Sequence, residues 1–236
     1  MSGLCLLPVA SVSAKETEQT VSANSQEISV SADTVEISDT TDLDADATIV
    51  HSGKDGALNW SIDSNGLLTI SGTGDYTGKE FEFVNGSYSY KMTLPQWYEY
   101  KDVIKSASVK VSGITSTNYM FYDCSNMVSI NLSGLDTSKV TSMGSMFSGC
   151  SSLSSLDVSG FDTSQVTYMN SMFYNCRGLT SLDVSGFDTS KARAMHAMFL
   201  DCSSLTSLDI SGFETSQVTN LSLIHISEPT RLQLIS

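Results

Sequence analysis

Four cysteines recur at a constant spacing and could serve as metal ligands, as disulfide partners or as buried thiols. Cys124, Cys150, Cys176 and Cys202 are each 26 residues apart. Zinc sites usually take cysteines in local pairs about two to four residues apart, and a disulfide needs Cα atoms roughly 4.4–6.8 Å apart. We therefore expect a column of buried thiols that pack as small hydrophobic side chains. Neither a metal ion nor a cofactor is predicted.

A polar ladder is the better candidate for binding. Asp157 lies between the apolar Leu156 and Val158, with Ser155 and Ser159 beside it. Alternation of this kind predicts a short strand whose polar side chains share the outer face. The predicted ligand-binding face, repeated in neighbouring coils, consists of Asn131, Asp157, Asp183, Asp209, Ser155, Ser181 and Ser207. Carboxylates about 4.8 Å apart repel one another and favour cations or a basic partner, but a solvated face with nothing bound explains the same residues equally well.

A second acidic column points to local structure more than to binding. Its members, spaced by the same 26 residues, are Asp136, Asp162, Asp188 and Glu214. Each is followed by Thr and Ser, and this cluster of side-chain acceptors is typical of a helix N-terminus. We expect these carboxylates to cap helices.

Catalytic motifs are missing from the sequence. Neither G-x-S-x-G nor H-E-x-x-H occurs. None of the histidines, His51, His196 and His225, has a partner at a matching position for general acid–base work. The sequence therefore predicts a protein that is not an enzyme.

The elements that position these residues follow from one repeated unit. From Leu153 to Cys176 it reads L-x-S-L-D-V-S-G-F-D-T-S-x-V-T-x-M-x-x-M-F-x-x-C. A fixed period of this length is typical of stacked repeats. The L-x-V core predicts a strand, and the later apolar residues, at steps of three and four, predict a short helix. We expect an α/β solenoid of 26-residue strand–turn–helix coils. Its structural core columns are Cys124, Cys150, Cys176, Cys202, Phe121, Phe147, Phe173 and Phe199.

The repeats also resemble a known family. The segments LDVSGFDTSQVTYMNSMFYNCRGLTS and LDVSGFDTSKARAMHAMFLDCSSLTS are similar to the repeats of BspA-like leucine-rich-repeat surface proteins of bacteria. The resemblance covers most of the chain from about Thr48 to Asn220. It implies a secreted or cell-surface protein that mediates adhesion to host matrix proteins or neighbouring cells. It also implies a β-rich cap before the repeats. The rival interpretation is a structural stalk or coat that displays another domain.

Composition excludes some partners. The chain has 236 residues and a formal net charge of −14. Without a basic stripe to neutralise phosphates, nucleic acid is not an expected partner. No run of 18 apolar residues occurs, so no membrane span is predicted.

Changes in composition divide the chain. Residues 1–14 end in Val-Ser-Ala and read as a signal-peptide remnant, with a buried strand as the alternative. Residues 15–47 are acidic, rich in Ser and Thr, and predicted to be a disordered spacer. Residues 48–103 are predicted to form a β-rich cap, with a hairpin from Leu58 to Ile70 and with Trp97 and Tyr98 covering the repeats. Residues 104–220 form the predicted solenoid, whose degenerate first strand spans about 104–111.

The last segment breaks the repeat pattern. Residues 221–236 place charged side chains where the core columns require apolar ones, and LSLIHISEPTR resembles the translation of a sequencing-library adapter. We expect this tail to be non-native and the natural protein to continue with further repeats.

Overall fold

A computed structural model describes residues 47–85 and 88–219. Contacts divide the chain into Met1–Asp42 and Leu43–Ser236, and every described residue belongs to the second unit. The predicted signal remnant, all of the predicted spacer except residue 47, and the predicted non-native tail lie outside the described residues.

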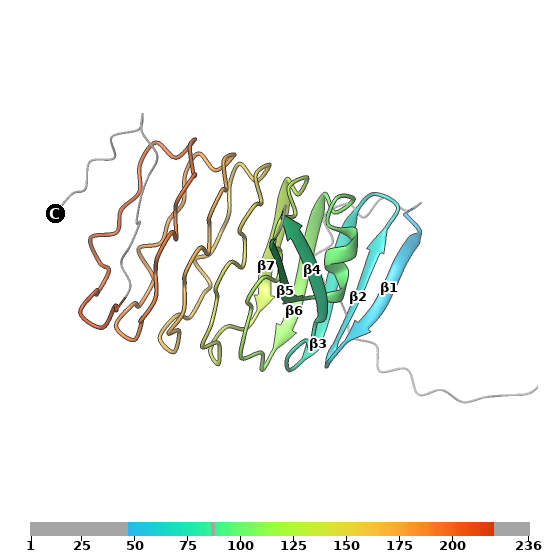
Figure 1. The fold of residues 1–236 in the computed structure, drawn as a ribbon, viewed down its shortest axis with the longest axis horizontal. Helices are drawn as coiled ribbons and strands as arrows, with labels where there is room; N and C mark the ends of the chain where they lie inside the picture. Colours follow the sequence, from blue (N-terminus) through green and yellow to red (C-terminus); the bar gives the residue numbers. More distant parts are fainter. Residues whose placement is uncertain (1–46, 86–87, 220–236) are drawn as a thin grey trace, which may run out of the picture. The chain divides into compact units, whose positions relative to one another are not determined.

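One five-stranded sheet carries most of the regular structure (Figure 1). Its strands lie in the order β1 (Ile49–Asp55), β2 (Leu58–Asp63), β3 (Leu67–Thr73), β6 (Ser106–Ser112) and β7 (Ser129–Leu135). The first three pair antiparallel. β3, β6 and β7 pair parallel. The sheet thus changes from a meander to the parallel pairing of successive coils.

The predicted hairpin and the predicted first strand of the repeats are confirmed. β2 and β3 pair through Trp60 and Ile70, and the apolar side chains of β2 are buried as their alternation requires. The Asp63 carboxylate accepts the backbone N–H groups of Asn65 and Leu67 at 2.9 Å and so closes the turn. β6 occupies the segment in which the degenerate first strand was expected.

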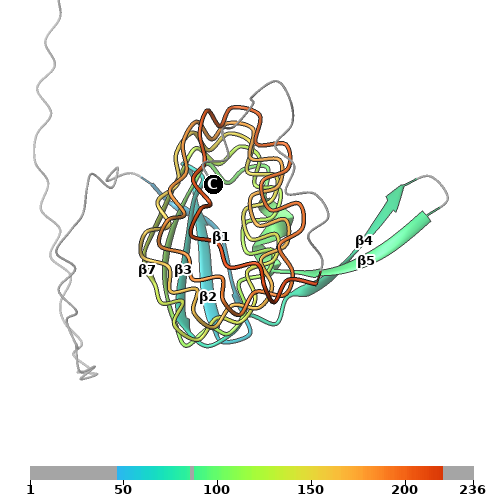
Figure 2. The ribbon, with the colours of Figure 1, turned by 90° about the vertical axis from the view of Figure 1, so that its left-hand side faces the viewer.

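A second hairpin was not predicted. β4 (Lys79–Asn85) and β5 (Tyr88–Leu94) pair antiparallel as a separate two-stranded sheet. Figure 2 shows this hairpin extending away from the coils. A 3-10 helix, η1 (Gln96–Tyr100), follows it and buries Trp97. The Trp97 indole N–H donates to the carbonyl of Met120 at 2.8 Å, which fastens η1 to the first coil.

The predicted α/β class is wrong, because no coil contains an α-helix. η1 is the only helix among residues 47–85 and 88–219, and the remaining regular structure is β-strand. Where helices were expected, consecutive tight turns run along the stack, and we call residues 117–124 and their equivalents in later coils the turn ladder. Its register is marked by parallel bridges between Ser116, Ser142, Tyr168 and Ala194.

Hydrogen bonds explain why the turn ladder is not helical. In the first coil the N–H groups of Tyr119, Phe121 and Asp123 donate to carbonyls of the next coil at 2.7–3.1 Å. The intervening N–H groups of Met120 and Tyr122 bond three residues back. Half of the amides therefore point along the stack, whereas every amide of an α-helix points along its own axis. The same alternation recurs in the following coils.

Backbone conformation enforces this pattern. Tyr119 and Asp123 have φ values of 62° and 58°, and Ser171 and Asn175, two coils later, have 55° and 60°. A left-handed residue at every fourth position ends an α-helix before it can complete a second turn. Apolar residues at steps of three and four still point inward, so spacing alone does not separate the two structures.

The phenylalanines of the turn ladder form one stacked column. Rings of Phe121, Phe147, Phe173 and Phe199 lie 5.6–5.8 Å apart between neighbouring centroids, with interplanar angles of 4–9°. All four are buried. The 26-residue period therefore aligns equivalent rings of successive coils.

No helix in the described part of the chain is long and apolar enough to cross a bilayer.

Candidate functional site

The candidate site lies on the side of the coils opposite the turn ladder, and we call it the acidic face. Asn131 belongs to β7, but its equivalents Asp157, Asp183 and Asp209 lie in segments with no regular strand pairing. Between these segments the structure records only longer hydrogen bonds, such as that from the Thr180 N–H to the Ser154 carbonyl at 3.2 Å. The expected continuous strand ladder is therefore wrong beyond β7.

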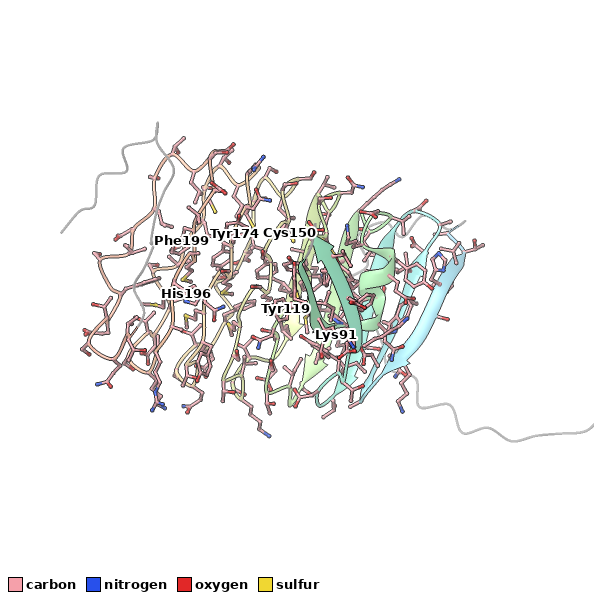
Figure 3. The ribbon with its side chains drawn as sticks, in the orientation of Figure 1. Lys91, Tyr119, Cys150, Tyr174, His196 and Phe199 are labelled. Atoms are coloured by element: carbon pink, nitrogen blue, oxygen red, sulfur yellow. The ribbon has the colours of Figure 1, made fainter. Side chains whose placement is uncertain are left out.

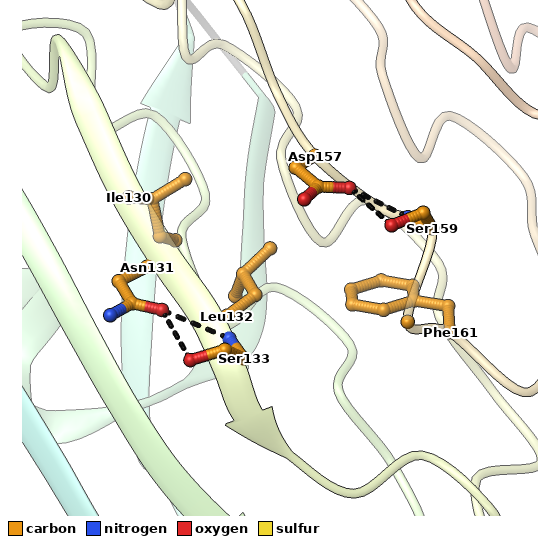
Figure 4. A pocket seen from close by; sticks show the side chains of 8 residues that line it. Ile130, Asn131, Leu132, Ser133, Asp157, Ser159 and Phe161 are labelled. Carbon is orange, nitrogen blue, oxygen red and sulfur yellow. Dashed lines mark hydrogen bonds between the residues drawn. The ribbon is translucent and has the colours of Figure 1, made fainter. Parts of the chain in front are cut away.

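Each acidic-face carboxylate is held by the serine that follows it. Asp157 accepts the Ser159 N–H at 2.9 Å and the Ser159 hydroxyl at 2.7 Å (Figure 4). Asn131 accepts the same two bonds from Ser133 at 3.0 and 2.8 Å. In later coils the N–H groups of the equivalent serines donate to Asp183 and Asp209 at 2.9 Å. The Asp-x-Ser motif thus fixes the side chain before any ligand arrives.

These hydrogen bonds keep the carboxylates ionised. The Ser159 hydroxyl and then its N–H lower the pKa of Asp157, and the same donors of Ser185 lower the pKa of Asp183. For Asp209 the N–H of Ser211 is the larger cause of the lowered pKa and its hydroxyl the second. Donors to a carboxylate favour its charged form. The acidic face therefore stays negative well below neutral pH.

Two shallow hollows bring the predicted residues together. The larger, of about 510 Å³, crosses three coils and is lined by Ser155, Leu156, Asp157, Ser181, Leu182, Asp183, Ser207 and Asp209. The smaller, of about 400 Å³, joins Asn131 to Asp157 above Phe161 (Figure 4). Six of the seven predicted binding residues therefore line one hollow, and Asn131 lines the adjoining one.

The second acidic column has a local role. Asp136, Asp162 and Asp188 each accept the backbone N–H of the serine two residues later at 2.9–3.0 Å. These bonds close turns of the Asx type. The expected helix caps are therefore turn caps, because no helix follows them.

The cysteine column is buried and reduced. Cys124, Cys150, Cys176 and Cys202 are free thiols. The Cys150 thiol donates to the Phe121 carbonyl at 3.1 Å, and the next two thiols repeat this bond at 3.1 and 3.0 Å. Burial raises the thiol pKa to about 12 for Cys124 and Cys202 and raises it for the other two as well. Cys150, Cys176 and Cys202 therefore act as hydrogen-bond donors in addition to filling space.

A threonine column was missed as an element of structure. The buried Thr163 hydroxyl accepts the Asp188 N–H at 2.8 Å and donates to the Asp188 carbonyl at 3.1 Å. Thr137 and Thr189 hold the next coil in the same way. The constant phase of Thr in the Phe-Asp-Thr-Ser motif was the available signal. A buried polar side chain needs a hydrogen-bond partner, and one that recurs in every coil can find it in the neighbouring coil.

Asp55 is a further polar residue that sequence reasoning missed. It is fully buried and accepts N–H groups of Thr77, Gly78 and Gln96 at 2.8–3.0 Å, together with the Thr77 hydroxyl. The carboxylate thereby joins the end of β1 to the base of the second hairpin and to η1. A buried charge with this many donors is a structural clamp.

Metal-ligand geometry is missing from the described ranges, 47–85 and 88–219. No group of three His, Cys, Asp or Glu side chains is placed there to hold an ion. His51 stacks on Tyr100 with centroids 4.0 Å apart, and His196 lies in the turn ladder of the last described coil. His225 lies outside the described residues.

Comparison with solved structures identifies a leucine-rich cell surface protein from Faecalibacterium prausnitzii. The two are 17% identical with a TM-score of 0.26, and the match covers 73% of this chain and 50% of that protein. The chain thus spans about half the length of that protein. No curated protein matches this chain significantly.

A family model matches the repeats directly. The family described as "Mycoplasma protein of unknown function, DUF285" matches residues 96–205 and again residues 180–227. Together the two matches span more than half of the chain, from η1 through every described coil. The chain therefore belongs to the DUF285 family.

Proposed function

We propose that this chain is a bacterial surface protein that mediates adhesion by binding proteins of the host matrix or of neighbouring cells through its acidic face. The binding region is a set of equivalent carboxylates, exposed and held in one orientation, on successive coils. The surface location rests on the resemblance of the repeats to those of BspA-like proteins.

One observation carries the proposal. Asp157, Asp183 and Asp209 line a single hollow while their serine partners fix and ionise them. A preorganised row of charges loses little conformational freedom on binding, and it steers a basic surface toward it. The activity proposed is binding, and no catalytic step is assigned.

The test replaces charge without changing shape. In the triple variant Asp157→Asn, Asp183→Asn, Asp209→Asn each amide oxygen can still accept the serine N–H, as Asn131 does in the native chain. We expect attachment to an immobilised basement-membrane extract, or to cells, to fall about tenfold or more, because complementary charge is lost. Attachment is measured by surface plasmon resonance on the extract and by cell counting.

A matched control has the same change in net charge. The triple variant Asp136→Asn, Asp162→Asn, Asp188→Asn neutralises three exposed turn carboxylates outside both hollows. We expect its attachment to stay within about twofold of the native protein. Equal losses in the two variants would indicate a general effect of charge and would refute a defined binding face.

A structural stalk is the second candidate, and the stacked column from Phe121 to Phe199 favours it. Coils locked in this way hold a fixed distance along the stack, as a stalk requires. Native attachment in the acidic-face variant would support the stalk over the adhesin.

A further inference from the structure

A second surface, built from aromatic side chains, lies away from the acidic face. Phe83 and Tyr90 stack across the β4–β5 hairpin with centroids 5.3 Å apart. Phe83 also approaches Tyr98 of η1 at 6.2 Å, and Tyr98 approaches Tyr122 of the first coil at 6.0 Å. Tyr122 packs against Tyr119 at 5.6 Å. We call these five side chains the tyrosine surface.

Its outer members are accessible while its base is fixed. Tyr98 is only 9% exposed and anchors the cluster, whereas Tyr90 is 51% exposed. Tyr119 and Tyr122 are partly buried on the turn ladder. Figure 3 shows Tyr119 and Tyr174 on the coils and Lys91 on the hairpin. Aromatic side chains that are half exposed around a buried anchor are typical of binding hot spots.

The lysines near this surface are already paired. Lys91 bonds Glu80 at 2.6 Å, and Lys79 pairs with Glu99. Lys101 reaches two carboxylates, at 2.9 and 3.1 Å. Lys91, Glu80 and Glu82 lie on the face of the hairpin opposite Phe83 and Tyr90. On the aromatic side two lysines, Lys79 and Lys101, face three carboxylates: Glu99, Asp102 and Asp123. The local charge is therefore net negative, and it complements a cationic ligand.

The rings near the base already hold cations. Lys79 lies 5.6 Å from the Phe81 ring centroid, and Lys101 lies 5.8 Å from that of Tyr98. Among the described residues no such contact is recorded for Tyr90, Tyr119 or Tyr122. These outer faces can receive a cation from outside, because the ring quadrupole attracts it at this range.

We propose that the tyrosine surface binds an arginine-bearing segment of a partner protein. The planar guanidinium group stacks on the outer tyrosine rings and donates to the carboxylates at their edge. Arginine fits better than lysine because it combines stacking with several fixed donors. A second copy of this chain is a poor partner, since its formal net charge of −14 would repel the same surface.

The test compares two tyrosines of equal exposure. Tyr90→Ala removes a ring that is 51% exposed within the tyrosine surface. Tyr168→Ala removes one that is 49% exposed and lies just before the turn ladder of its coil, with no recorded ring contact to that surface. The probe is an immobilised peptide of Arg-Gly-Ser repeats, with a citrulline peptide of the same length as its neutral counterpart. Binding of the full chain is measured by interferometry at fixed ionic strength.

We expect Tyr90→Ala to raise the Kd for the arginine peptide about tenfold. Tyr90→Phe, which keeps the ring, and Tyr168→Ala should stay within about twofold of the native protein. The citrulline peptide should bind at least about tenfold more weakly. Thermal melting of each variant checks that the fold persists, and Tyr90→Ala should still raise the Kd about tenfold when it is made in the acidic-face asparagine variant.

Several results would overturn the proposal. These are equal binding of the arginine and citrulline peptides, an equal loss in Tyr168→Ala, and no binding by the native chain. Loss of peptide binding in the acidic-face variant, with native binding in Tyr90→Ala, would move the site to the acidic face. Binding of a neutral polysaccharide in place of the arginine peptide would refute the assigned partner class.

Discussion

The two sides of each coil are held together in different ways. On the turn ladder, every second amide bonds the next coil at 2.7–3.1 Å, and the phenylalanine rings stack behind it. On the acidic face, the bonds between coils lengthen to 3.2 and 3.5 Å at Thr180 and Thr206. The aspartate side chains there bond the serines of their own coil. Stability therefore resides mainly in the turn ladder, which leaves the acidic face free to bind.

The largest effect should come from removing one ring of the column. Phe173→Ala leaves a cavity between Phe147 and Phe199 and should lower the free energy of unfolding by about 3–5 kcal/mol. Ser181→Ala, at an exposed position of the acidic face, should change it by less than about 0.5 kcal/mol. Urea denaturation followed by circular dichroism measures both. Similar losses in the two variants would remove the contrast between the two sides.

A buried hydroxyl should matter next. Thr163→Val strands the N–H and the carbonyl of Asp188 and should cost about 1–3 kcal/mol. Thr180→Val removes an exposed bond of 3.3 Å on the acidic face and should cost under about 0.5 kcal/mol. The same denaturation assay compares them. If Thr163→Val is as stable as the native protein, the threonine column does not hold neighbouring coils together.

High pH should lower the free energy of unfolding through the buried thiols of the turn ladder. Unfolded thiols ionise near about pH 8.5, whereas burial raises the pKa to about 12 in Cys124 and Cys202. The stabilisation is complete below about pH 8.5 and is lost as the pH rises toward the folded value, by about 1.4 kcal/mol per thiol and pH unit. Urea denaturation with reductant at pH 8, 9 and 10 gives the free energy of unfolding at each pH. This free energy should fall less steeply with pH in Cys150→Ala than in the native protein. Identical slopes would show that Cys150 is not protected.

The acidic face should respond in the opposite direction and more weakly. Hydrogen bonds from Ser159 lower the pKa of Asp157, so its contribution is present above about pH 4 and is lost as the pH falls through the folded value. Because this carboxylate is fully exposed, the loss should be small. A steep loss of unfolding free energy below about pH 4 that is absent from the acidic-face asparagine variant would contradict this comparison.

The smallest effect should come from backbone conformation. Ala197 has a φ of 55°, which is costly for a side chain other than glycine. Ala197→Gly should therefore stabilise the protein by about 0.5–1 kcal/mol. Ala194→Gly, three residues earlier and without a positive φ, should destabilise it by a similar amount because it only adds freedom to the unfolded chain. Thermal melting separates the two, and a loss of stability in both would argue against a left-handed residue at position 197.

Repeat spacing predicted which residues share a column, but it did not predict the backbone conformation of the segments that carry them. Val166, Met169, Met172 and Phe173 are buried, as a helix would have required. A turn ladder buries the same positions. The two structures differ in their left-handed residues, which include Ser171 and Ala197, and serine and alanine do not favour that conformation. In Asp123, Gly149, Asn175 and Asp201, by contrast, the residue types do favour it.

In the cap region, the first hairpin was predicted from its alternating apolar residues, but the second hairpin was missed. Leu58, Trp60 and Ile62 correctly indicated β2. The second hairpin carries an equally clear signal, with Phe81 and Phe83 alternating before Asn85-Gly86. The repeat length places equivalent acidic-face side chains next to one another, so six of the seven predicted residues line one hollow and Asn131 lines the adjoining one.

Native-state hydrogen exchange tests the division between the two sides most directly. The turn-ladder amides of Ser145 and Phe147 bond the next coil at 2.9 Å, and the acidic-face amides of Thr180 and Thr206 bond at 3.2 and 3.5 Å. We expect the first pair to exchange only through global unfolding and the second pair through local opening, at least about a hundredfold faster. Equal protection of the two pairs, or faster exchange in the turn ladder, would contradict the account.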